Sequence, residues 1–203
     1  MRRTSLAFAL AFIPALASLA PAQNALPKII RGEIVSIEGE NFAVRTREGE
    51  NIRLHLKNAQ RIDAVIPADL SDIKPGVFVG AAAMPEEDGE LRALELHIFP
   101  EAARGQGEGS RQFDLTPGSS MTNANVTARV NSVSGPKLTL TYRGGEKTLI
   151  VDKETPIVTF APGGTSDIKP GASVDIFGAA QTADGVLEAG RIVIGRNGTK
   201  VPM

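Results

Sequence analysis

The feature that most constrains the fold of this chain is an internal duplication. The hexapeptide Ser-Asp-Ile-Lys-Pro-Gly at positions 71–76 recurs without change at positions 166–171. Because further matches keep the same order on both sides, two copies of one structural unit are expected, as a tandem pair rather than a solenoid. The further matches are Pro67 with Pro162, the Asp-Gly pairs at 88–89 and 184–185, and Leu91 with Leu187.

Within each copy, apolar residues fall at alternate positions of short runs, for example in 52–56 and 138–142. Alternation between Gly-containing turns predicts antiparallel hairpins with one buried face. The Asp-Gly pairs add strong hairpin turns, because Gly accepts a positive φ. The fold class predicted is therefore all-β, with two tandem small antiparallel β-barrels of the OB type (OB-like). The predicted ranges are barrel 28–100, Gly-rich linker 101–120 and barrel 121–198.

The N-terminus predicts a secretory signal peptide over residues 1–22. Arg2 and Arg3 precede an apolar run from Leu6 to Ala20 that is too short to span a bilayer as a stable helix. Small residues in Ala20-Pro21-Ala22 predict cleavage after Ala22. Since the chain has no cysteine, the predicted compartment is a bacterial periplasm rather than a disulfide-rich extracellular space.

The composition limits the classes of partner that the chain can bind. The chain has 22 basic and 23 acidic residues, so removal of Arg2 and Arg3 with the leader leaves 20 against 23, a net charge of −3. That balance gives no attraction to nucleic acid or to anionic lipid. Because the chain has no Trp and only one Tyr, aromatic stacking of bases is also disfavoured.

The connection between the copies is polar and Gly-rich over 104–110, but Phe113 and Leu115 interrupt it. Solvent exposure of these two side chains would offer no stabilisation, so the segment 112–115 is expected to pack between the barrels. The predicted inter-domain junction is therefore marked by Phe113 and Leu115, and a cleft beside it is the preferred place for a ligand.

Patterns that carry chemistry are sparse. The chain has no Gly-x-Ser-x-Gly elbow, no phosphate-binding loop and no His-Glu-x-x-His, so no catalytic or cofactor-binding residue is predicted. Glu95 and His97 could be two metal ligands on one outward strand face, with Met84 or Met121 as soft donors for copper. Since a site needs three or four convergent ligands, a solvated strand face is the favoured interpretation. A Ser-His-Asp triad around His97 has no sequence signal that would assemble it.

Nearly all of the chain after residue 28 resembles a family of exported proteobacterial proteins of unknown function, sometimes labelled as metal-transporter permease components. The resemblance lies in 72–76, in the run Leu91–Pro100, in the linker 104–109 and in 120–124. It implies tandem β-barrels and no known activity. The permease label conflicts with the sequence, because no apolar segment after the leader is long enough to cross a membrane.

The function that these observations favour is a non-enzymatic periplasmic binding or adaptor module for a protein or a small molecule. Its ligand would use an open strand edge or the groove between the barrels. The alternative is a periplasmic protein that handles copper or zinc, and a third hypothesis is a hydrolase that acts on envelope material.

Overall fold

The fold is built from short strands joined by tight turns, as the alternating sequence requires. A computed structural model describes residues 29–56, 61–133, 135–183 and 186–202, and the predicted signal peptide lies outside these residues. The described chain is all-β with small closed barrels and has no helix of seven or more residues, which confirms the predicted fold class. No helix in these ranges is long and apolar enough to cross a bilayer.

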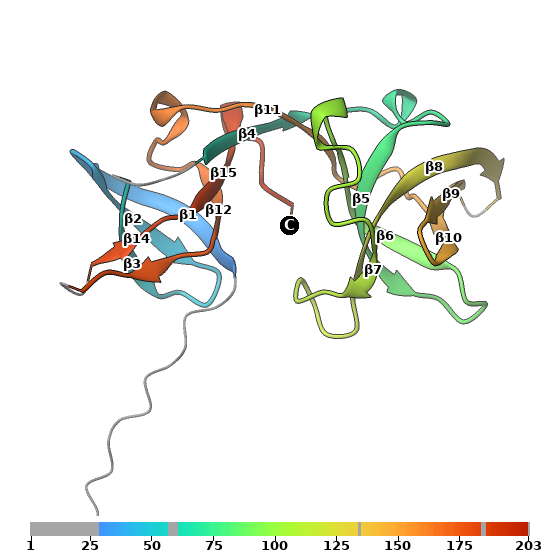
Figure 1. Ribbon diagram of the computed structural model, residues 1–203, viewed down its shortest axis with the longest axis horizontal. Helices are drawn as coiled ribbons and strands as arrows, with labels where there is room; N and C mark the ends of the chain where they lie inside the picture. The colour runs from blue at the N-terminus through green and yellow to red at the C-terminus, as the bar shows by residue number, and fades with distance from the viewer. Residues whose placement is uncertain (1–28, 57–60, 134, 184–185, 203) are drawn as a thin grey trace, which may run out of the picture.

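Two barrels lie side by side (Figure 1). The first, barrel A, has a core of Ile, Val, Leu and Phe side chains around Ile34, Val44 and Ile192. Its strands are β1 (Ile29–Glu38), β2 (Asn41–Thr46), β3 (Asn51–His55), β12 (Ser173–Phe177), β13 (Ala180–Gln181), β14 (Leu187–Glu188) and β15 (Arg191–Gly195).

The second, barrel B, has a separate core around Val79, Leu96 and Leu140. Its strands are β5 (Phe78–Pro85), β6 (Leu91–Ile98), β8 (Ser120–Ser132), β9 (Gly135–Tyr142) and β10 (Gly145–Ile150). A short extra strand, β7 (Gly109–Gln112), pairs with the beginning of β8.

Each barrel combines strands from both halves of the chain. In barrel A, β1 pairs with β12 antiparallel, and in barrel B, β5 pairs with β8. The parallel contacts β3–β14 and β6–β10 close the two barrels. This strand order, with one parallel pair at the closure, is an OB-type barrel whose last two strands come from the other half of the chain.

The predicted ranges therefore need a correction. Residues 28–100 and 121–198 do not each enclose a core, because the barrel A core contains Ile34 together with Ile192, and the barrel B core contains Val79 together with Leu140. The physical reason is the strand β4 (Arg61–Pro67), which pairs with β15 of barrel A and with β11 and so leads the chain from barrel A towards barrel B (Figure 1).

β4 and its counterpart β11 (Ile157–Pro162) form the bridge between the barrels. They pair antiparallel with Val65 opposite Phe160 in the middle, so Pro67 and Pro162 lie at symmetric ends. β4 also pairs with β15 of barrel A, and β11 with β6 of barrel B. The fifteen strands of the described residues thus form one continuous hydrogen-bonded sheet.

Local features recur at matched places of the two halves. A bulge interrupts β1–β2 between Ile34 and Ser36, and another interrupts β8–β9 between Val126 and Ala128. The repeated hexapeptide ends in a turn in which Gly76 and Gly171 have φ of 92° and 83°. A Pro followed by a Gly at positive φ defines a type II turn, which explains why this dipeptide occurs twice.

Candidate functional site

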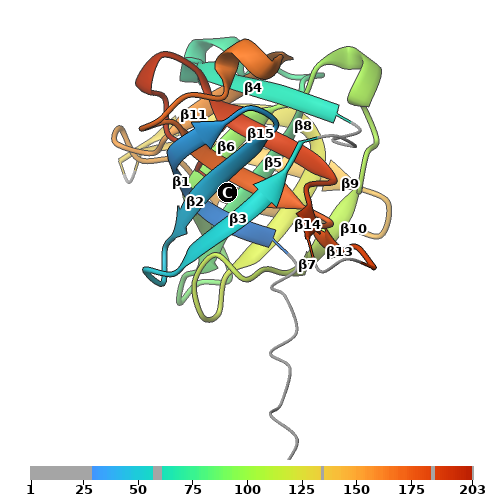
Figure 2. The ribbon, with the colours of Figure 1, turned by 90° about the vertical axis from the view of Figure 1, so that its left-hand side faces the viewer.

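The candidate site is the junction between the two barrels, which lie side by side in Figure 1 and one in front of the other in Figure 2. Cross-strand register sets two rows of side chains. On barrel B, Asn123, Gly80 and His97 are neighbours across β8, β5 and β6. On barrel A, the corresponding row holds Arg31, Asp175 and Val193 across β1, β12 and β15.

Glu95 and His97 are buried in this junction, with exposed fractions of 1% and 2%. The interpretation of their strand face as solvated is therefore wrong. The period of two correctly directs both side chains away from the core of barrel B, but that outer face packs against β11 and barrel A. His97 Nδ1 lies 3.5 Å from Glu95 Oε2.

Aromatic rings surround His97. Its ring packs edge-on against Phe99 and Phe160, with centroids 4.7 and 5.5 Å away. Gly80 lies directly beneath the ring, since a Cβ built there would overlap Nε2 and Cε1 of His97 and come within 2.9 Å of Asn123 Oδ1. The glycine is therefore required by the close approach of the histidine, and the ring is fixed from three sides.

Three buried acceptor oxygens of the junction have no hydrogen-bond donor among the described residues. They are Glu95 Oε1, Asn123 Oδ1 and Asp175 Oδ2. Burial raises the pKa of Asp175 to about 7; Arg31 and Arg47 oppose this rise, and the charges of Glu95 and Asp114 add to it. Arg31 Nε lies 3.7 Å from Asp175 Oδ2, but burial outweighs this ion pair, so about half of the Asp175 carboxyls are protonated near pH 7.

A second group of charges is fully paired. Asp63 of β4, also buried, accepts hydrogen bonds from Arg61 and Arg191, each at 2.8 Å. The Arg191 guanidinium lies over the rings of Phe160 and Phe177, 5.7 and 5.4 Å from their centroids. These contacts join the bridge to barrel A and compensate for the burial of the Asp63 carboxylate.

The described residues contain no group of three or more His, Cys, Asp or Glu side chains that could hold a metal ion. Met121, one predicted soft donor, is buried on β8 opposite Arg111 of β7. In the described chain His97 is hydrogen-bonded to Glu95 and to no serine hydroxyl, so a triad is not assembled there.

The connection between the halves is folded. Arg104 ties it to barrel B by donating hydrogen bonds to Asn125 Oδ1 of β8 and to the Gly76 carbonyl, and β7 adds to the edge of β8. Phe113 then reaches barrel A, because the Arg31 guanidinium lies 5.4 Å from its ring centroid and binds Asp114 at 2.7 Å. Leu115 is half-buried in the turn between β7 and β8.

The outer edge of β7 carries unpaired backbone groups. The Phe113 amide donates to the Ser119 carbonyl of the segment leading into β8, so the odd-numbered residues of β7 face β8. By strand alternation, the N–H and C=O groups of Ser110 and Gln112 point the other way. The turn and loop hydrogen bonds of the described residues do not involve these four groups.

Sequence reasoning missed Arg31, Asp175 and β7. The duplication held one signal for Asp175: aligned on the repeated hexapeptide, Gly80 of the first copy corresponds to Asp175 of the second. A glycine replaced by a carboxylate in the middle of an apolar strand marks a place where the outer faces of barrels A and B differ. No comparable signal indicated β7, because Gly-Ser-Arg-Gln has no strand pattern.

Comparison with known proteins found no matching family model, no matching curated protein and no matching solved structure. The chemistry of the junction therefore has to be interpreted from its geometry.

Proposed function

We propose that this chain is an exported, non-enzymatic binding or adaptor protein of the bacterial envelope. Its ligand binds at the junction, beside the folded connection. The observation that carries the proposal is the unpaired outer edge of β7, which brings free backbone donors and acceptors next to both barrels. Sheet edges of this kind are binding sites for extended segments of other proteins.

The buried groups of the junction support a rigid platform rather than a reaction centre. Catalysis requires a nucleophile or general base that can reach a substrate, whereas His97 is enclosed by Gly80, Phe99 and Phe160. The contacts of Arg31 with Phe113 and Asp114 hold the connection against barrel A. A fixed connection presents β7 in one conformation, which lowers the entropic cost of binding.

Export is the second part of the proposal, and it rests on the leader of residues 1–22. Edman sequencing of the protein purified from a periplasmic fraction should begin at Gln23. A retained Met1 in that fraction would contradict it.

The binding function is tested with mature protein immobilised through a C-terminal tag and exposed to envelope extract. The proposal predicts a partner that is retained saturably, is displaced by free mature protein, and binds directly once purified. Titration of the same protein with Cu²⁺ and Zn²⁺ distinguishes the metal-handling alternative. Stoichiometric metal binding without any saturable partner would overturn the proposal.

A further inference from the structure

We propose that β7 binds an extended acidic segment of a partner protein by strand addition, with a carboxylate of that segment opposite Arg111. This inference rests on the proposed function and names the partner class for the same site. It starts from the four free backbone groups of Ser110 and Gln112, whose spacing matches that of a neighbouring strand in a sheet.

β7 is an asymmetric addition to a nearly symmetric scaffold. The matched strands of barrels A and B pair in the same registers, yet β7 extends only the edge of β8. Among the described residues, barrel A has no strand at the corresponding edge of β1. Because β7 belongs to neither barrel closure, a segment added to its outer edge leaves both cores intact.

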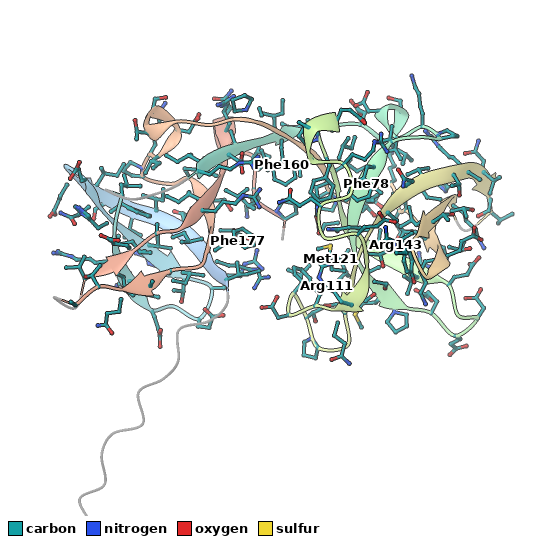
Figure 3. The ribbon with its side chains drawn as sticks, viewed as in Figure 1. Phe78, Arg111, Met121, Arg143, Phe160 and Phe177 are labelled. Atoms are coloured by element: carbon teal, nitrogen blue, oxygen red, sulfur yellow. The ribbon has the colours of Figure 1, made fainter. Side chains whose placement is uncertain are left out.

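Arg111 supplies the charge that selects the segment. Its side chain is exposed and donates a hydrogen bond to the Gly107 carbonyl at 3.1 Å, and no described carboxylate lies within ion-pair distance. It shares a strand face with Phe113, which contacts Arg31 of barrel A. Figure 3 places Arg111 and Met121 on the side of barrel B that faces barrel A.

The charge of Arg111 also distinguishes between the segments that could bind at the edge of β7. A second copy of this chain pairing through β7 about Arg111 would set two guanidinium groups opposite each other, which is destabilising. A Glu or Asp at the same place gives an opposite-charge cross-strand pair instead. The residue opposite Arg111 occupies a non-hydrogen-bonded position, where side chains come closest, while its two neighbours bond to Ser110 and Gln112.

The test uses the mature protein and two acetylated, amidated pentapeptides, Thr-Val-Glu-Val-Thr and the matched Thr-Val-Lys-Val-Thr, followed by ¹⁵N NMR. The acidic peptide should shift the Ser110 and Gln112 amide signals and slow their hydrogen exchange. The Arg111 amide should change less, since it already bonds to β8. The acidic peptide should bind about tenfold more tightly than the Lys peptide.

Arg111→Glu should reverse the preference, and the matched control Arg45→Glu, on the exposed face of β2, should keep it. If neither peptide at millimolar concentration moves the two amides, strand addition at β7 is wrong. If both bind equally, or Arg111→Glu changes nothing, the acidic class is wrong. These outcomes are independent of the envelope capture, so a partner retained equally by the wild type and Arg111→Glu would leave the proposed function standing and overturn only this inference.

Discussion

Replacing Gly80 with Ala tests how tightly the junction is packed. The new methyl group would overlap the His97 ring, which cannot move aside because Phe99 and Phe160 pack against it. Gly80 has no positive φ, so the cost is steric alone. Overpacking a filled core costs about 1–3 kcal/mol, and 2 kcal/mol lowers the melting temperature of a chain this long by about 4–8 °C.

The assay is thermal and urea unfolding of the mature protein, with a double-mutant cycle. Gly80→Ala in the background of His97→Ala should cost less than in the wild type by about 1–2 kcal/mol, because the ring that it meets is gone. Gly164→Ala is the matched control, since its Cβ would meet only Ser166 Oγ at 3.8 Å. Additive costs, or a neutral Gly80→Ala, would refute the proposed packing of the histidine.

Two further perturbations address the charges and the connection. The pKa of Asp175 rises from 3.8 to about 7 on folding, so the folded chain binds this proton more tightly than the unfolded chain. The contribution of this proton to the free energy of unfolding is complete below about pH 4 and is lost as the pH rises through 7. Asp175→Asn should therefore gain stability relative to the wild type between pH 4 and 8, by at most about 4 kcal/mol in urea titrations, and a difference that does not vary with pH would contradict the cause assigned. Phe113→Ala removes the ring beneath Arg31, so it should lower the free energy of unfolding by about 1–2 kcal/mol and loosen the pair of barrels in small-angle scattering. An unchanged melting temperature and scattering profile would mean that the connection is passive.

The strands were predictable because alternation depends only on local burial. The apolar positions of 52–56 and 138–142 correspond to β3 and β9, and the Asp-Gly pair at 88–89 turns β5 into β6 with Gly89 at a φ of 82°. The second Asp-Gly pair lies outside the described residues. Turn residues and the alternation of apolar positions thus predicted the strands, although not which strands pair with each other.

The partners of the strands were not predictable from alternation. Because the halves are similar, β5 can meet β8 with the same apolar face that it would offer to β1, and sequence gives no preference. The exchange of strands between the two barrels follows from β4, whose extended course depends on pairing with β11 and β15 far along the chain. A long-range contact of this kind leaves no local pattern.

The same limit explains the error at Glu95 and His97. Their side chains do point away from the barrel B core, as the alternation indicates, but β11 and barrel A cover that face. Only Phe99, adjacent on the same face, indicated an apolar environment, and a single aromatic residue is normal on a surface. Burial between two barrels requires knowledge of how they pack.

The exchange of strands between the barrels is tested most directly by cutting the connection. A recognition site for a sequence-specific protease is inserted between Gly105 and Gln106, which are both exposed. After cleavage, the two pieces should coelute at the volume of the uncut protein and separate only in denaturant, since each barrel contains strands of both pieces. Two folded fragments that elute separately without denaturant would show that each half closes its own barrel, and would contradict the account.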